Sequence, residues 1–339
     1  MKKLILLELN EINFDVVSYY LGQGISLPAF QHLIEKGLNI TESEADYECL
    51  EPWIQWPSVH TGKTYDEHSV FRLGDFVNSS YEQFFEKVEK AGFSVGAISP
   101  MNASNKLNNP AYFIPDPWSH TPCDNSFLSN RVTEAVVQAV NDNSKSKITI
   151  RTVFNLGLAF VALVNPFRYI HMAVYAATSF GKPWRKALFL DMVLYEIHKT
   201  LLKRKNPNFS TLFLNAGAHI QHHYFFNSSF VDSPDLKNPS WYVRKDEDPF
   251  LEMLLVYDQI LLDLLSLPDT ELIIATGLSQ KPYENLKFYY RLRDHRAFLK
   301  RLGIECKDVM PRMTRDFLVS FDSIEQASLA QTQLAAILV

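Results

Sequence analysis

Short apolar runs recur along the chain, and each ends in polar residues. Leu4–Leu9 is almost unbroken, and Phe93–Ile98, Ser210–Asn215 and Glu271–Ala275 have the same character. Apolar runs of this length are typical of strands buried on both faces in a parallel sheet. Glu252–Leu267 and other segments between them have helical periodicity, so strands alternate with helices. This order predicts an α/β fold with a central, mostly parallel sheet between helix layers.

Further helices are expected where apolar residues recur at helical spacing next to capping residues. They are Phe14–Leu21, Pro28–Lys36, the residues after Pro57, Tyr81–Ala91 and Ala297–Leu302. The segment EPWIQWPSVHTG, which starts at Glu51, contains two prolines, so we do not expect a regular helix at its beginning.

The middle of the chain has a different pattern. After a polar linker, Asn141–Lys147, two apolar segments, Val153–Val164 and Tyr169–Phe180, flank Asn165–Arg168. Neither apolar segment has the about 20 residues that span a bilayer. One interpretation is a pair of buried helices in a cap insertion. The alternative is a membrane-surface or re-entrant segment, which the flanking residues favour: Arg151, Arg168, Lys182, Trp184, Arg185 and Lys186. The predicted division is 1–145 and 206–339 for the two parts of the core, and 146–205 for the helical cap insertion.

Charge and cysteine content narrow the class of protein. The net charge of -5 and the scattered basic residues give no footprint for nucleic acid. The three cysteines lie far apart in the sequence, which argues against a disulfide framework and a thiolate metal site. The apolar N-terminal run is interrupted at Glu8, too early for a signal peptide. We therefore expect a cytoplasmic protein with peripheral membrane contact as an open possibility.

Polar residues follow the first predicted strand directly. Glu8, Asn10, Glu11 and Asn13 stand at its carboxyl end. Because open α/β sheets bind ligands beyond the carboxyl ends of their strands, this edge is the expected place of the site. Glu8 and Asn10 are candidate ligand-binding residues.

Four sequence blocks resemble the alkaline phosphatase superfamily, in particular its type I phosphodiesterase and sulfatase-like branch. They are LILLELN, WPSVHTGKTYDEHSV, LFLNAGAHIQHHYFF and LIIATGLSQ, and they occur in the family's order. The resemblance implies a sheet between helix layers with the site at the carboxyl ends of the strands. It places the family's first metal-binding aspartate at Asn10 and its nucleophile at Pro52, and it retains a histidine at His222.

Several of these positions lack the side chains that two-metal chemistry requires. Besides Asn10 and Pro52, the family's acidic and histidine positions fall on Ala218, Gly277 and Leu278. Two-metal phosphoryl or sulfuryl transfer needs carboxylates and imidazoles around the ions and an oxygen nucleophile beside them. We therefore expect a divergent member without ordinary two-metal phosphatase chemistry.

A histidine cluster follows the third predicted strand. If a helix begins there, His219 faces His222 and His223 at spacings i+3 and i+4. One divalent ion, Zn or Mn, could then bind to His222, His219 and Asn10, with Glu8 or Glu51 completing the shell. The alternatives are a pocket for a phosphorylated or carbohydrate-like small molecule, without metal, and a structural cluster. Lys281 at the end of Gly277–Lys281 is a further candidate for an anion.

Glu51 and His222 are the candidate catalytic residues. Glu51 would serve as a general base or nucleophile, especially if Trp53 and Trp56 raise its pKa by desolvation; the alternative is an acid at a helix N-terminus. Hydrolase or transferase chemistry predicts Glu51, the histidines and Asn10 in one cleft. A catalytically inactive binding protein predicts that Trp53, Trp56 or the cap fills that cleft. In a third alternative, the 153–180 region binds a membrane surface or a partner.

Overall fold

A computed structural model describes residues 2–44, 46–141, 150–284, 292–311 and 317–337. Contacts divide these residues into two compact units, one within 2–140 and 150–284 and a smaller one within 292–337. The core therefore ends at Glu284, whereas the sequence assigned 206–339 to it. The predicted boundary at residue 145, and all of the predicted linker except Asn141, lie within 142–149, outside the described residues.

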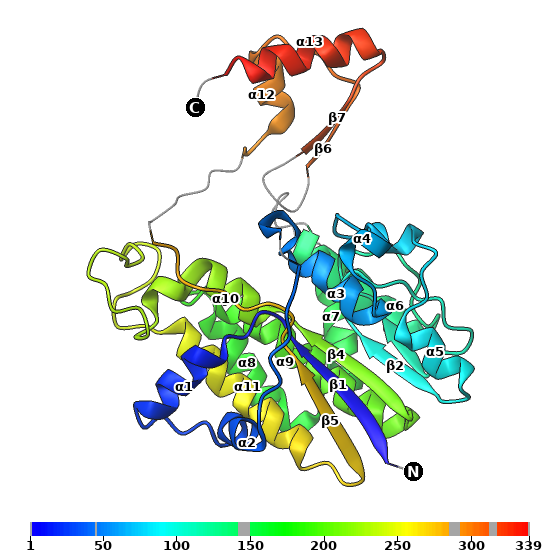
Figure 1. The fold of residues 1–339 in the computed structure, drawn as a ribbon, viewed down its shortest axis with the longest axis vertical. Helices are drawn as coiled ribbons and strands as arrows, with labels where there is room; N and C mark the ends of the chain where they lie inside the picture. The colour runs from blue at the N-terminus through cyan, green and yellow to red at the C-terminus, as the bar shows by residue number, and fades with distance from the viewer. Residues whose placement is uncertain (1, 45, 142–149, 285–291, 312–316, 338–339) are drawn as a thin grey trace. The chain divides into compact units, whose positions relative to one another are not determined.

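The large unit is built on a five-stranded, all-parallel sheet (Figure 1). Its strands are β1 (Lys3–Leu9), β2 (Val95–Ile98), β3 (Tyr112–Ile114), β4 (Phe209–Leu214) and β5 (Thr270–Ala275), in the order β3-β2-β4-β1-β5. Leu9 of β1 pairs with Leu214 of β4, and Glu8 pairs with Ala275 of β5. The four strands predicted from apolar runs are confirmed, and their carboxyl ends meet at one edge.

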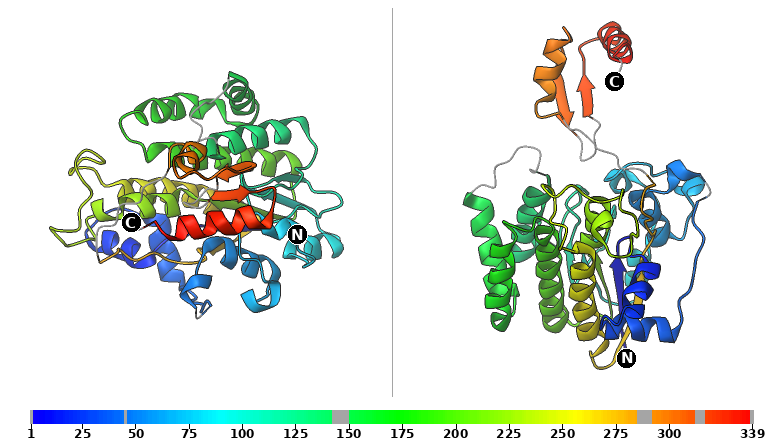
Figure 2. Two further views of the ribbon diagram at one scale, coloured as in Figure 1. Left: turned by 90° about the horizontal axis from the view of Figure 1, so that it is seen from above. Right: turned by 90° about the vertical axis from the view of Figure 1, so that its left-hand side faces the viewer.

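Helices cover both faces of this sheet. The helices of this unit are α1 (Phe14–Gly22), α2 (Pro28–Lys36), α3 (Pro52–Thr61), α4 (Tyr65–His68), α5 (Phe84–Lys90), α6 (Phe127–Asn141), α7 (Ile150–Leu163), α8 (Tyr169–Thr178), α9 (Arg185–Lys205), α10 (Ala216–Tyr224) and α11 (Pro249–Leu265). Ile5, Leu7 and Leu9 face one core with α1, α2, α9 and α11. Leu6 faces the other core with Phe85 of α5. Figure 2 shows the helices on the two sides of the sheet. The expected α/β fold with flanking helix layers is confirmed.

Helix α3 begins earlier than the sequence suggested. Pro52 stands at its first position, where a missing amide hydrogen costs nothing, and Gly62 ends it with φ 68°. Pro57 lies inside the helix and cannot donate to the carbonyl of Trp53. The buried Asn102 side chain donates to that carbonyl instead, at 2.6 Å. A tertiary hydrogen bond thus permits a proline that local rules exclude.

The helical segment 146–205 lies beside the sheet. Helix α9 packs directly on β4 and β2, so it belongs to a helix layer, and α7 and α8 pack against α9 (Figure 2). The segment therefore adds a further layer of helices where the sequence suggested a cap.

The smaller unit has its own architecture. It contains α12 (His295–Arg301), α13 (Ile324–Ala335) and an antiparallel pair, β6 (Asp308–Pro311) and β7 (Phe317–Ser320). Leu299, Ile304 and Ala330 form its core.

Candidate functional site

The polar residues at the carboxyl end of β1 are all buried: Glu8, Asn10, Glu11 and Asn13. Alternation along the strand turns Glu8 toward α3, and the chain then leaves the sheet through Asn10 and Glu11. Glu11 has φ 61°, a left-handed conformation that is uncommon for a residue with a side chain. Such conformations persist where the surrounding structure holds them, often at functional sites.

Asn10 belongs to an interior hydrogen-bond network. Its Nδ2 donates to Asn215 Oδ1 at 2.8 Å, and its Oδ1 accepts from Trp56 Nε1 at 2.8 Å. Trp56 is fully buried, and it packs edge-to-face on Phe213 of β4. A Cβ at Gly277 would stand 3.2 Å from the Trp56 ring. The indole therefore fills the space beside Asn10, which is the arrangement expected for a filled cleft.

Glu8 is also engaged inside the protein. Its Oε1 lies 3.0 Å from Nε2 of His60 in α3, and both side chains are fully buried. The rings of Phe84 and Phe85 lie against His60. The sequence predicted that Glu8 binds a ligand. In the structure it points to the α3 side of the sheet and contacts His60.

Glu11 lies at the centre of the remaining polar groups. Gln280 Nε2 donates to Glu11 Oε2, and His222 Nε2 of α10 lies 3.5 Å from the same oxygen. Gln221 Nε2 donates to the Glu11 carbonyl at 2.6 Å. Burial raises the pKa of the Glu11 carboxyl, and the hydrogen bond from Gln280 partly offsets this. Close packing of α10 helps to form this arrangement, since a Cβ at Gly217 would meet Ile12 at 2.5 Å.

Glu51 completes a pair of acidic side chains. It is the residue before the first turn of α3, and its carboxyl is half-buried. Burial raises its pKa, and the negative charge of Glu11 raises it further. The sequence suggested a raised pKa of Glu51 through desolvation by Trp53 and Trp56; in the structure the causes are burial and the charge of Glu11. The charge of one carboxyl makes a neighbouring carboxyl harder to ionise.

The three histidines of α10 point in two directions. The His219 and His223 rings lie 4.6 Å apart, and His223 Nδ1 is 2.8 Å from the Tyr242 hydroxyl. His222 instead approaches Glu11. Loss of hydration lowers the pKa of all three, to about 4 for His219, where the other two histidines also contribute. They are therefore neutral near pH 7. The helix and its i+3 and i+4 spacing are as predicted.

The predicted metal ligands do not converge. Asn10 is engaged by Trp56 and Asn215, whereas His219 turns toward His223. Within the described parts of the chain, no three His, Cys, Asp or Glu side chains are arranged to hold a metal ion. Lys281 is exposed, directly after Gln280.

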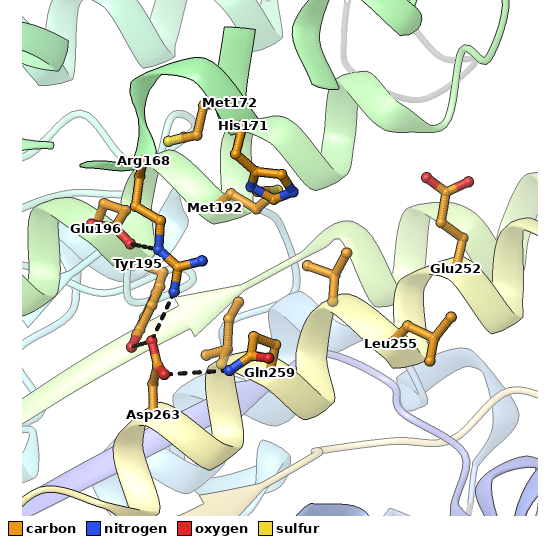
Figure 3. Close-up of a pocket in the computed structure, with 12 residues that line it drawn as sticks. Arg168, His171, Met172, Met192, Tyr195, Glu196, Glu252, Leu255, Gln259 and Asp263 are labelled. Carbon is orange, nitrogen blue, oxygen red and sulfur yellow. Dashed lines mark hydrogen bonds and ion pairs between the residues drawn. The ribbon is translucent and has the colours of Figure 1, made fainter. Parts of the chain in front are cut away.

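A concavity lies between α8, α9 and α11, away from Glu11 and Glu51, with a volume of about 320 Å³ (Figure 3). Met172, Met192 and Ile260 form part of an apolar wall. At one end, Arg168 reaches Asp263 at 3.3 Å and Glu196 at 3.7 Å. Because these two carboxylates neutralise the guanidinium, this end offers little to an anion.

No family model, no curated protein and no solved structure matches this chain. The resemblance to the alkaline phosphatase superfamily therefore rests on the four sequence blocks. Of the residues around the acidic pair, Gln280 was not anticipated. Trp56, by contrast, was one of the residues that the sequence named as able to fill the cleft of an inactive binding protein. Glu11 was visible only as one polar residue among several after the first strand, because its left-handed backbone has no local sequence signal.

Proposed function

We propose that this chain binds a neutral, carbohydrate-like ligand at the carboxyl edge of the sheet, as a divergent relative of the alkaline phosphatase superfamily. The observation that carries this proposal is the acidic pair of Glu11 and Glu51 beside His222. Carboxylates accept hydrogen bonds from hydroxyl groups, and a neutral imidazole can accept one hydrogen bond and donate another. Gln280 adds an amide to the same place.

Of the two ligand classes that the sequence left open, the charge around Glu11 and Glu51 favours the neutral, carbohydrate-like one. Like charges repel, so two carboxylates disfavour a phosphorylated ligand unless a cation intervenes. The neutral His222 supplies no positive charge near pH 7, and the contacts that hold Glu11 come from uncharged groups. A polyhydroxylated neutral ligand meets no such repulsion.

The acidic pair of Glu11 and Glu51 is also compatible with catalysis. Carboxyls whose pKa is raised by burial are groups that general acid–base catalysis uses, so hydrolase or transferase activity on the bound ligand is part of the proposal. A binding protein without catalysis is the second candidate. It is favoured by Trp56, whose indole fills the space beside Asn10 where the superfamily resemblance places a metal ligand.

Replacing Glu51 by glutamine is expected to weaken binding of a neutral saccharide about tenfold to a hundredfold, since a hydrogen bond to a charged group contributes about 1.5–3 kcal/mol. Binding is measured by calorimetry against a panel of neutral saccharides and their phosphorylated forms. Glu11→Gln is expected to act in the same direction. Glu48→Gln is the matched control, because Glu48 is exposed and three residues away.

The proposal is contradicted if a sugar phosphate binds more tightly than its neutral parent and Lys281→Ala abolishes that binding. Product analysis of the saccharides that bind then separates the two candidates. Turnover lost in Glu51→Gln identifies an enzyme, whereas binding without turnover identifies a binding protein.

A further inference from the structure

The outward face of α7 and α8 is apolar and exposed. On α8, Ile170, Ala173, Val174 and Ala177 follow the helical repeat of one face, and all four are exposed. On α7, Phe154 and Val161 lie two turns apart and are exposed too. The adjoining Phe167 and Phe180 have 95% and 92% of their surface accessible. Contiguous exposed apolar residues of this kind mark an interaction surface.

The inner side of α8 contacts the rest of the large unit, so its apolar outer face points away from the core. Met172 of α8 is buried in the large core, and Tyr175 donates to Glu252 of α11 at 2.7 Å. Tyr169 donates to the Val161 carbonyl at 2.9 Å and thereby joins the two helices. The exposed side is therefore a fixed outer surface of the large unit.

The charged side chains in and around α7 and α8 are all basic between Asp142 and Asp191. No Asp or Glu occurs between Asp142 and Asp191, although acidic residues outnumber basic ones in the whole chain, 38 to 33. The basic residues of this stretch are Lys145, Lys147, Arg151, Arg168, Lys182, Arg185 and Lys186. Three of them have acidic partners that lie outside the stretch: Arg168 with Asp263, Lys182 with Glu247, and Arg185 with Glu252. The segment itself carries only positive charge.

We propose that the outer face of α7 and α8 docks on an anionic membrane surface. Phenylalanine and isoleucine side chains enter the boundary between headgroups and acyl chains, and lysines and arginines attract anionic headgroups. Across the part of the chain that the structure describes, no helix has the length and apolarity to cross a bilayer. The helices thus lie in the plane of the membrane surface. The absence of carboxylates from the segment argues for anionic lipid over a symmetric dimer through this face, because two faces of the same positive charge repel each other.

Sedimentation of the full chain with lipid vesicles tests this proposal. We expect binding to vesicles of phosphatidylcholine mixed with phosphatidylglycerol, and much weaker binding to phosphatidylcholine alone or at high salt. Ile170→Ser is expected to reduce the partition coefficient about tenfold, because the removed apolar surface contributes about 1.4 kcal/mol or more when it is buried. Lys186→Glu is expected to reduce binding to the anionic vesicles only.

Ile40→Ser is the matched control, since Ile40 is an isoleucine of the same unit with 95% of its surface exposed, against 81% for Ile170. Circular dichroism verifies that each variant is folded. The proposal is overturned if the chain binds neither vesicle, or if Ile40→Ser weakens binding as much as Ile170→Ser. It is also overturned if light scattering shows a dimer that Ile170→Ser dissociates, because the face would then bind a second copy.

Discussion

Replacement of Trp56 by alanine is expected to lower the free energy of unfolding by about 3–5 kcal/mol, the usual cost of removing a large buried aromatic side chain. Trp56 is fully buried and packs on Phe213, and its indole donates to Asn10. The substitution therefore opens a cavity at the carboxyl edge and leaves Asn10 Oδ1 without its donor. Urea unfolding followed by circular dichroism measures the change.

Two further variants separate packing from hydrogen bonding. Trp56→Phe keeps most of the volume but removes the donor, so about 1–3 kcal/mol is expected to be lost. Trp241→Ala is the control, because Trp241 is exposed and its loss is expected to change stability by about 0.5 kcal/mol or less. If Trp56→Ala costs no more than the control, the indole does not close this edge.

The second large effect concerns Asp191 of α9, which caps the start of α10. Its buried carboxylate accepts from the backbone amides of Ala216 at 2.8 Å and Asn215 at 3.3 Å, and from the Tyr257 hydroxyl at 2.6 Å. Asp191→Ala leaves these donors without their acceptor, so we expect a loss of about 3 kcal/mol or more. The same variant is expected to disturb Asn215, the partner of Asn10.

Asp191 also makes stability depend on pH. Burial raises its pKa from 3.8 to about 6, although hydrogen bonds from Tyr257, Ala216 and Asn215 oppose the rise. The folded protein therefore binds this proton more tightly than the unfolded chain. The resulting stabilisation is complete below pH 4 and is lost as the pH rises through 6, which amounts to about 3 kcal/mol.

Asp191→Asn tests this dependence because the amide does not titrate. Urea unfolding of both proteins between pH 4 and pH 7 is the measurement. The wild type is expected to lose stability relative to the variant as the pH rises, and parallel profiles would contradict the assignment. Asp116, whose pKa burial also raises to about 6, contributes equally to both proteins and cancels in the comparison.

The candidate site was only partly predictable. The carboxyl edge was expected because polar residues follow β1, and the structure brings Glu11, Glu51 and His222 together there. Glu8 and Asn10 face inward, since they contact His60 and Trp56 of α3, a helix in which Asn102 binds the carbonyl that Pro57 leaves free. No local pattern specifies which side chain fills the space beside another.

The sequence by itself determined the sheet, most of its helices and the unusual middle segment. Strands buried on both faces must be apolar throughout, and β1, β2, β4 and β5 can therefore be recognised one at a time. The three residues of β3 are too few to show a pattern, and the separate unit after Glu284 is defined by contacts between distant residues.

Only the tertiary structure decided what the carboxyl edge contains. Asn10, Trp56 and Asn215 are separated by up to 205 residues in the chain, yet they form one hydrogen-bonded group. Parallel strands bring their ends to the same edge, but the volume of the Trp56 indole and the backbone angle at Glu11 determine which polar atoms are engaged. Those are properties of packing in three dimensions, and hydrophobic periodicity carries no information about them.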